Sequence, residues 1–464
     1  MKILVLSIAP IFKEFVHGGS QRILMNILEK LSIKNEIKVF CTSRKDNHLH
    51  FKIGKAIDIF PILPFREFFP FPYMTNPKNI VRIIEIINSE SKWADCIYIH
   101  ADGYLLKGYL QKFNKPVIVS YHDFVYPITI SSAFLSDVDK IIFPSEYLSQ
   151  CFLNTVGTLY SNIKERIEII TNGINPSIFF KDISKERELK EKYGIKKDEK
   201  VLLFPHRPEK SKGVIETLQL LQKLIESGEN VRLLFPKYID LKYDKGIHED
   251  YKNLNELLIK MNISQYVSFF PWLPYNEMRH IYSLSNICLN TGNFTEAFGL
   301  VPLESLLCET PVISTKSGNL RHILAFDYDG IETYNYGDNE NLLFLTRKLL
   351  HKKDFNFKDV HSYIKKRFNF KKMLDHYDRS FMNLAKKPLL KHNTDRNNDF
   401  TKFKIAPWCY VSDKGIYDDY IGNYHYLDKT TLIKCEKNII IKRKDLGNYF
   451  EELVRNNVII PFDE

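Results

Sequence analysis

The sequence has few cysteines and no apolar run long enough to cross a membrane. A membrane-spanning helix needs about 18 consecutive apolar residues, and no run in the 464-residue chain approaches that length. The seven cysteines are an odd number, scattered without the C-x-x-C spacing of zinc or redox sites. This pattern predicts a chain of the reducing cytoplasm, with neither a disulfide framework nor a zinc site.

The chain also lacks motifs that mark several common ligand classes. A glycine pair, Gly18-Gly19, follows the first apolar run, but no third glycine completes the six-residue dinucleotide fingerprint. We therefore disfavour a nicotinamide dehydrogenase. No nucleic-acid-binding motif matches either, so nucleic acid is not an expected partner. Neither an internal repeat nor a low-complexity segment is evident.

A positive charge is the main compositional bias. Lysine and arginine number 66 against 56 acidic residues, which gives a formal net charge of +10. This excess would suit a polyanionic ligand or an anionic membrane face, although a solvated surface is the simplest interpretation. The 44% hydrophobic and 26% charged fractions are typical of a globular protein, and 464 residues predict at least two domains.

Short apolar runs alternate with helical patterns up to about residue 170. The first run, Lys2–Ile8, could be mistaken for a signal peptide, but no small-residue cleavage site follows it, so we predict a buried strand. The alternation predicts a parallel sheet covered on both faces. Strands are expected at Lys2–Ile8, Ile37–Cys41, Cys96–His100, Val117–Tyr121 and Lys140–Phe143, and helices at Ser20–Leu31, Ile80–Glu90 and Glu146–Thr155.

A second alternating set follows a charged connector at residues 181–200. Two doubly wound halves in one chain imply a cleft between them, with ligands near the carboxyl ends of the strands. Strands are expected at Val201–Pro205, Arg232–Phe235, Val267–Phe270 and Ile287–Asn290, and helices at Gly213–Ser227, Asn253–Met261 and Pro274–Leu284.

The C-terminal region divides into helices, a linker and a tail. Residues 354–384 have the pattern of long helices, and the polar, basic residues 386–400 are typical of a linker. In the tail, residues 401–464, we expect a hairpin turning at Gly422-Asn423, a strand at Asn438–Lys442 and a helix at Asp445–Asn456. The tail could be a winged-helix-like partner-binding module, or a domain that simply buttresses the rest. The expected domains are residues 1–180, 181–385 and 401–464, with 386–400 between the last two.

Residues 290–314 carry the densest candidate site. We expect a loop holding Glu296, a short helix opened by Pro302 with Glu304 in its first turn, and a strand at residues 311–314. The two carboxylates would face one ligand from two sides. A helix N-terminus favours a phosphate, and glycine lets the backbone approach closely. The N–H groups in that position would be those of Phe298, Gly299 and Leu300.

A second candidate segment follows the expected strand at Val201–Pro205. Arg207 and Lys212 lie five residues apart in a loop that precedes the helix beginning at Gly213. A basic surface turn is the simplest interpretation. The two side chains can also point at one anion, arginine as a bidentate fork and lysine as a point charge.

The segment Glu296-Ala-Phe-Gly-Leu-Val-Pro-Leu-Glu304, followed by Thr310-Pro-Val-Ile-Ser, resembles the signature of the retaining GT-B glycosyltransferases of the family 4, group 1 type. The resemblance implies an α/β protein with two Rossmann-like domains that face each other across a cleft, here with a small C-terminal α+β extension. Residues 1–180 would be the acceptor side and residues 181–385 the nucleotide-sugar side, with helices that cross back to the first half. The resemblance does not cover the tail.

The resemblance also implies roles for individual residues. Arg207 and Lys212 would neutralise the departing nucleoside diphosphate. Glu296 would contact the donor sugar, and Glu304 the ribose hydroxyls. His122, at the end of the expected strand Val117–Tyr121, would position the donor sugar and would not act as a general base. The catalytic set is thus Arg207, Lys212, Glu296 and His122, and the substrate-binding set is Gly18, Gly19, Phe298, Gly299, Leu300 and Glu304.

Three positions depart from the family pattern. His206 stands where glycine is usual before Arg207, and Asn175 replaces the aspartate of a structural turn. Arg321 stands where the family has a glutamate. From the sequence alone, the change at Arg321 could concern either the local fold or the choice of donor.

The activity implied is a retaining hexosyltransferase that uses a UDP- or GDP-linked sugar as co-substrate and needs neither cofactor nor metal. Asp327-Tyr328-Asp329 has metal-binding spacing but lies in a polar loop, so we expect solvated carboxylates there. The acceptor could be a glycan, lipid or protein, and the aromatic run at residues 60–73 could face it or a membrane. A cytoplasmic protein is expected, with peripheral contact to the inner membrane face as an option. The alternatives are an epimerase or phosphorylase on the same fold, and an inactive nucleotide-sugar-binding scaffold.

Overall fold

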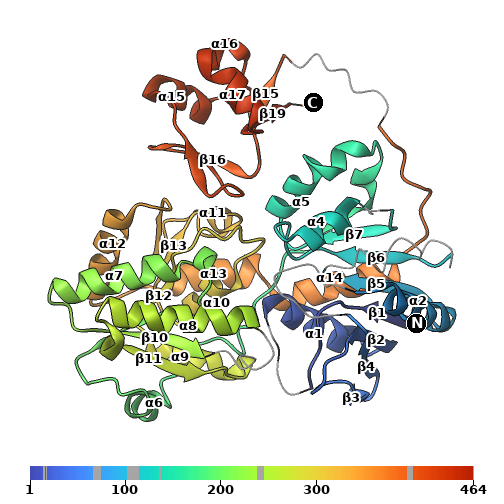
Figure 1. Ribbon diagram of the computed structural model, residues 1–464, viewed down its shortest axis with the longest axis horizontal. Helices are drawn as coiled ribbons and strands as arrows, with labels where there is room; N and C mark the ends of the chain where they lie inside the picture. Colours follow the sequence, from blue (N-terminus) through green and yellow to red (C-terminus); the bar gives the residue numbers. More distant parts are fainter. Residues whose placement is uncertain are drawn as a thin grey trace.

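The computed structural model (Figure 1) describes the chain except residues 14, 15, 17, 66–74, 102–113, 135–136, 238–244, 394–400 and 463–464. Most of the aromatic run at residues 60–73 and the end of the expected linker lie outside the described residues. None of the helices in the described part combines the length and apolarity that crossing a bilayer requires.

The first lobe is built on an eight-stranded sheet of β1 (Lys2–Leu6), β2 (Glu36–Thr42), β3 (Phe51–Ile53), β4 (Ile57–Leu63), β5 (Cys96–His100), β6 (Val117–Ser120), β7 (Lys140–Phe143) and β8 (Ile167–Ile169). The order is β3-β4-β2-β1-β5-β6-β7-β8, and all pairs are parallel except β3 with β4. Ile3 to Leu6 in β1 are fully buried, as expected of a strand covered by helices on both faces. The five strands expected in this half are confirmed.

The helices that cover this sheet begin and end where local signals place them. Their apolar residues recur at helical spacing: in the first helix Ile23, Leu24, Ile27, Leu28 and Leu31 are buried. The second starts earlier than expected, because Pro77 occupies its first position and the Asn76 side chain accepts from the Asn79 N–H. They are α1 (Gly19–Leu31), α2 (Pro77–Trp93), α4 (Pro127–Phe134) and α5 (Glu146–Leu153).

The second lobe is a parallel six-stranded sheet of β9 (Lys200–Leu203), β10 (Val231–Lys237), β11 (Val267–Pro271), β12 (Ile287–Asn290), β13 (Val312–Thr315) and β14 (Ile331–Tyr334). Its order is β11-β10-β9-β12-β13-β14. It is covered by α6 (Glu186–Lys192), α7 (Val214–Glu226), α8 (Lys245–Lys260), α9 (Met278–Leu284), α10 (Leu300–Leu307), α11 (Leu320–Ile323), α12 (Asn339–His351) and α13 (Lys358–Arg367).

After α13 the chain crosses back to the first lobe. The next helix, α14 (Phe370–Met382), lies beside α1 and the first sheet (Figure 1). Its Met373, Tyr377 and Phe381 are buried in the same apolar cluster as the residues of β1 and α1. Lys30 of α1 also pairs with Asp375 at 2.7 Å. A C-terminal helix therefore completes the N-terminal core.

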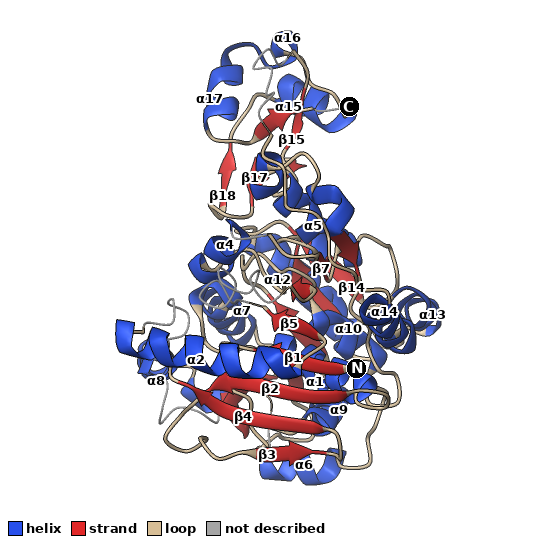
Figure 2. Ribbon diagram, turned by 90° about the vertical axis from the view of Figure 1, so that its right-hand side faces the viewer, coloured by secondary structure: helices blue, strands red, loops and turns tan. Residues whose placement is uncertain are grey.

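The tail contains both strands and helices. It comprises β15 (Phe403–Ile405), β16 (Cys409–Ser412), β17 (Gly415–Asp418), β18 (Asn423–His425), α15 (Lys429–Lys437), α16 (Arg443–Leu446), α17 (Phe450–Arg455) and β19 (Ile459–Pro461). β15 pairs with β19, and β16, β17 and β18 form an antiparallel sheet. Figure 2 shows the tail standing over α5 at one end of the molecule.

Three expectations for the tail were wrong in detail. The expected strand at residues 438–442 is reduced to a single bridge between Ile441 and Phe403. The helix expected at residues 445–456 is interrupted at Gly447, whose φ of 52° is left-handed, so it becomes α16 and α17. The hairpin turns at residues 419–422, because Asn423 already begins β18 and pairs with Asp418.

Candidate functional site

The loops that follow β9 and β12 lie next to each other at one edge of the second sheet. β9 pairs with β10 on one side and with β12 on the other, so the order of the strands reverses here. At such a switch point, α/β proteins bind ligands beyond the carboxyl ends of the strands. The segments that leave these two strands, residues 204–213 and 291–299, carry the expected Arg207, Lys212 and Glu296.

Two of the predicted residues form a direct ion pair. Lys212 Nζ lies 2.6 Å from Glu296 Oε1 and 3.5 Å from the centroid of the Phe294 ring. Both charged side chains are largely covered, with 16% and 20% of their surface exposed. Arg207 belongs to the same loop as Lys212 and pairs with Glu209 at 2.7 Å. The structure thus gathers two cations and two carboxylates at the switch point.

The two loops touch through their backbones as well as their side chains. The Phe294 N–H donates to the Ser211 carbonyl at 2.8 Å. Gly213 has a φ of 90°, and a Cβ there would overlap the backbone nitrogen of Gly292. Glycine at residue 213 is therefore required both for the left-handed conformation and for the close approach. This contact holds Lys212 beside Glu296.

The helix after Glu296 begins earlier than expected. α10 starts at Leu300 and not at Pro302, so Glu304 lies in its second turn and not its first. Gly299 provides the N-cap with a φ of 95°. The Phe298 side chain is buried against Phe368, with ring centroids 5.6 Å apart. The backbone of Phe298, Gly299 and Leu300 thus lies at the N-terminus of α10, where a phosphate would be favoured.

Glu304 is buried at a contact between the lobes. It is 3% exposed, and its two oxygens accept from Arg22 Nη1 at 2.7 Å and from the Tyr282 hydroxyl at 2.9 Å. Burial raises the pKa of Glu304, and the nearby Arg22 opposes the rise. A carboxylate can accept about four hydrogen bonds, so it retains acceptor capacity for a ligand. Because Arg22 lies in α1, this pair joins the two lobes.

The glycine pair also lies at this contact. Gly19 begins α1, and a Cβ there would lie 3.2 Å from Leu300 Cδ1. Gly18 is extended, with a φ of −173°, and a Cβ there would meet nothing within 4 Å. The Trp272 Nε1–H of the second lobe donates to the Val16 carbonyl at 3.3 Å. The glycine loop of the first lobe therefore faces the N-terminus of α10.

His122 follows β6 and packs against a second histidine, with the two rings tilted by 36°. Its ring centroid lies 4.3 Å from that of His100, and its Nε2 lies 3.1 Å from Ser120 Oγ. Shielding from solvent lowers the pKa of His122 to about 4. The ring is therefore neutral at pH 7. His122 was predicted, but its partner His100 was not.

The loop after His122 reaches the second lobe. The Tyr126 ring lies 6.1 Å from that of Phe294, and Ser145 Oγ donates to the Ala297 carbonyl at 2.6 Å. Both partners flank Glu296 in the sequence. The first lobe therefore contacts the segment that carries Glu296, and the described site residues all lie at or near the junction of the lobes.

The structure shows the surroundings of two departures from the family pattern, His206 and Arg321, and it explains the second. Burial, together with the charge of Lys212, lowers the pKa of His206 to about 3. Arg321 pairs with Asp419 of the tail at 2.8 Å. The carboxylate Asp329 of the Asp-Tyr-Asp segment pairs with Lys352 at 2.5 Å and accepts from the Asn356 N–H.

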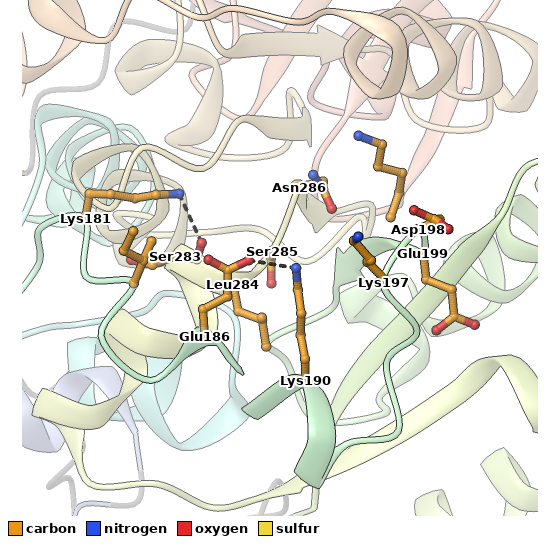
Figure 3. Close-up of a pocket in the computed structure, with 12 residues that line it drawn as sticks. Lys181, Glu186, Lys190, Lys197, Asp198, Glu199, Ser283, Leu284, Ser285 and Asn286 are labelled. Atoms are coloured by element: carbon orange, nitrogen blue, oxygen red, sulfur yellow. Dashed lines mark hydrogen bonds and ion pairs between the residues drawn. The ribbon is translucent and has the colours of Figure 1, made fainter. Parts of the chain in front are cut away.

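A pocket of about 440 Å³ lies elsewhere on the second lobe (Figure 3). It is lined by Lys200, which begins β9, by Asn286, which precedes β12, and by residues of α6. Lys181 Nζ donates to the Ser283 carbonyl at its wall. Because it lies at the amino ends of the strands, it is at the opposite edge of the sheet from Lys212 and Glu296.

Sequence reasoning missed the residues that hold the predicted ones in place. Arg22 and Tyr282 contact Glu304, His100 contacts His122, and Asp419 contacts Arg321. Arg22 is close to the glycine pair in the sequence, but no local pattern connects it to a residue 282 positions away. Asp419 lies in the tail, where no motif directed attention.

Comparison with protein families identifies the chain. A model described as glycosyl transferases group 1 matches residues 185–368, and one described as glycosyltransferase family 4 matches residues 17–178. The chain belongs to the group 1, family 4 glycosyltransferases. The two matches correspond to the two lobes, and neither includes the tail.

Two curated relatives match parts of this glycosyltransferase. An uncharacterized glycosyltransferase of Methanocaldococcus jannaschii is 27% identical over 212 residues, 43% of this chain and 52% of that protein. The alpha-monoglucosyldiacylglycerol synthase of Streptococcus pneumoniae is 28% identical over 246 residues, 52% of this chain and 48% of that protein. The chain therefore spans about half the length of these curated relatives.

Solved structures confirm the GT-B fold. Sucrose-phosphate synthase of Thermosynechococcus elongatus superposes with a TM-score of 0.66 at 16% identity, over 82% of this chain and 98% of that one. HepE of Anabaena, in complex with UDP and glucose, gives a TM-score of 0.65 at 15% identity, over 83% and 100%. At such identities the likeness concerns the fold alone.

Proposed function

We propose that this glycosyltransferase moves a hexosyl group from a UDP- or GDP-linked sugar to an acceptor, with retention of anomeric configuration and without a metal ion. One observation carries the proposal. Lys212 and Glu296 meet at 2.6 Å at the switch point of the second sheet, in the segments that leave β9 and β12. Family membership and the UDP-bound state of the structurally similar HepE support the same choice of donor.

The arrangement suits the departure of a nucleoside diphosphate. Arg207 and Lys212 supply positive charge where negative charge develops, and the amides of residues 298–300 supply helix-end dipoles. Both cations are paired with glutamates, Glu209 and Glu296. When the donor binds, its phosphate and sugar hydroxyls would replace these contacts.

Retention follows if departure and attack use the same face of the sugar. The bond from the anomeric carbon to the diphosphate oxygen breaks, and its electron pair stays with the diphosphate. The acceptor oxygen bonds to that carbon on the same face, and the departing phosphate takes the acceptor proton. His122 and Glu296 orient the sugar in this scheme, and contact between the lobes excludes competing water.

The test is donor turnover by the purified full chain. With UDP-glucose, UDP-N-acetylglucosamine or GDP-mannose and a panel of lipid, glycan and protein acceptors, we expect release of nucleoside diphosphate in the presence of EDTA. Arg207→Ala should lower the rate ~10²–10³-fold, as loss of one charge-stabilising group does. Lys210→Ala, which removes an exposed charge from the same loop, is the matched control and should retain activity.

Other outcomes would select the alternatives. Tight donor binding without turnover across the panel would support a scaffold. Conversion of the sugar without transfer, or transfer to inorganic phosphate, would support an epimerase or a phosphorylase. An α-configured donor that yields a β-linked product by NMR would contradict retention.

A further inference from the structure

The hairpin of the tail contacts both lobes through its turn. The turn after β17 carries Asp419, which is 3% exposed although it lies at the tip of a hairpin. Its neighbour Gly422 has a φ of 70°, and a Cβ there would lie 2.6 Å from the Asn293 side chain of the second lobe. Figures 1 and 2 show the tail seated over the end of the molecule that carries α5.

Asp419 is held by four groups of the glycosyltransferase lobes. Arg321 Nη1 donates to its two carboxylate oxygens at 3.1 and 2.8 Å, and the Gly318 N–H donates to Oδ1 at 3.0 Å. The Tyr147 hydroxyl of the first lobe donates to Oδ2 at 2.8 Å. Thr295 Oγ1 donates to the Asp419 backbone carbonyl at 2.9 Å. One residue of the tail is therefore in contact with both lobes.

Two of these contacts lead directly to Glu296. Thr295 precedes it in the chain. On the other side, the Asn319 N–H donates to the Glu296 carbonyl at 2.7 Å, and a Cβ on Gly318 would lie 2.5 Å from that carbonyl oxygen. Glu296 thus has Thr295 before it in the chain and the segment 317–319 packed against its backbone. Asp419 binds Thr295 and this segment.

Charge explains why Arg321 occurs at its position in this chain. Its side chain is 10% exposed and that of Asp419 is 0% exposed, so each charge needs the other. A glutamate at residue 321 would place two carboxylates together with little solvent and would repel the tail. Arg321 Nη2 also donates to the Pro407 carbonyl at 2.7 Å, which fixes the start of the hairpin region.

We propose that Asp419 is a positioning residue: the tail completes the glycosyltransferase site by holding the loop that presents Glu296 to the donor sugar. The role of Glu296 in transfer rests on the proposed function. The attachment of the Glu296 loop to Asp419 does not rest on it, so the attachment and the transfer reaction can be tested separately.

The first measurement is hydrogen exchange of the full chain, which needs no substrate. In Asp419→Asn we expect peptides covering residues 293–300 and 316–320 to exchange at least about fivefold faster, because the charged contacts of this side chain with Arg321 and the Gly318 N–H are weakened. The bond from Thr295 to the backbone carbonyl of residue 419 is kept. Asp428→Ala is the control: it removes the cap of α15, where its side chain accepts from the Thr431 N–H and hydroxyl, and its side-chain hydrogen bonds among the described residues stay within α15. It should leave these two peptides unchanged.

The second measurement uses turnover. Asp419→Asn should lower kcat about tenfold and raise the donor KM while the acceptor KM stays the same, since misplacement of a contact group lowers the rate. Arg321→Gln should do likewise, and the double variant should lose little more than either single one, because the two residues act as a pair. Thr295→Val removes one hydrogen bond and should show a smaller change in the same direction. This variant provides the test if Asp419→Asn fails to fold.

The outcomes separate the two proposals. Unchanged exchange at residues 293–300 in folded Asp419→Asn and Thr295→Val would overturn the positioning role, whether or not the protein is active. Equal effects of Asp428→Ala would show that the tail only stabilises the fold. Faster exchange in Asp419→Asn, in a protein whose wild type turns over none of the donors, would leave the positioning of the loop intact and would contradict the proposed transfer reaction.

Discussion

At the scale of residues, the surroundings of the histidines decide their charge. Desolvation lowers the pKa of His122 to about 4, that of His206 to about 3 and that of His322 to about 4. The pKa of His100 is lowered for the same reason. Each ring is therefore neutral at pH 7. His122 can accept or donate one hydrogen bond to position a sugar, but it carries no charge to stabilise a leaving group.

The lowered pKa values predict loss of stability in acid. A histidine whose folded pKa lies below its usual 6.5 stabilises the fold above pH 6.5, and this contribution is lost as pH falls from 6.5 towards the folded value. For His122, a fall from 6.5 to about 4 corresponds to about 3 kcal/mol. Urea unfolding between pH 7 and pH 4 should show this decline.

His122→Asn is the variant that assigns the effect. It should make the free energy of unfolding less dependent on pH in that range, whereas His248→Asn, at an exposed position, should not. An unchanged slope in His122→Asn would show that the folded and unfolded pKa values of this histidine are alike.

At the scale of elements, the site depends on two loops that could not approach each other with larger residues. Gly213 ends the β9 loop with a φ of 90° and lies against Gly292 of the β12 loop. The contact sets where α7 begins and where Lys212 points. The local sequence predicts a helix starting here, but the reason for glycine is the neighbouring loop.

Gly213→Ala should therefore destabilise the protein more than strain alone explains. Gly228 provides the comparison, because its φ is 84° but a Cβ there would meet nothing within 4 Å. Gly228→Ala should cost about 1–2 kcal/mol for the left-handed backbone. Gly213→Ala should cost about 1–3 kcal/mol more, from overlap with residues 291–292. Urea denaturation measures both, and equal losses would contradict the close approach.

At the scale of the whole molecule, the two lobes are not independent of each other. α14 follows the second lobe in sequence but belongs to the first lobe's core. Its Phe381 is 1% exposed and packs edge-on against Tyr98 of β5, with ring centroids 5.3 Å apart. The adjoining Met382 is 63% exposed. The C-terminal helix therefore stabilises the N-terminal sheet.

Phe381→Ala should lower the free energy of unfolding of the first lobe by about 3–5 kcal/mol, because it leaves a cavity in the core. Met382→Ala should change it by less than about 0.5 kcal/mol. Urea denaturation, monitored by hydrogen exchange of the β1 and β5 amides, reports on that lobe. Similar small effects of both substitutions would place α14 outside the core.

Much of the fold could be predicted from local patterns. The strands Cys96–His100 and Lys140–Phe143 have the predicted bounds, because buried parallel strands are continuous apolar runs between polar turns. Phe51–Ile53 could not be found in this way, since a three-residue edge strand is defined by its pairing with β4. Ile441 shows the opposite error. Its apolar neighbours predicted a strand, but the packing of the tail forms only a single bridge there.

The sequence by itself determined the two α/β lobes, and it predicted the residue types of the site from their places at strand ends and helix starts. The tertiary structure alone decided which residues meet. Lys212 and Glu296 are 84 residues apart, Arg22 and Glu304 are 282 apart, and Arg321 finds its partner 98 residues away in the tail. The physical reason is that secondary structure follows from short-range periodicity, whereas an ion pair depends on how distant segments are brought together by packing.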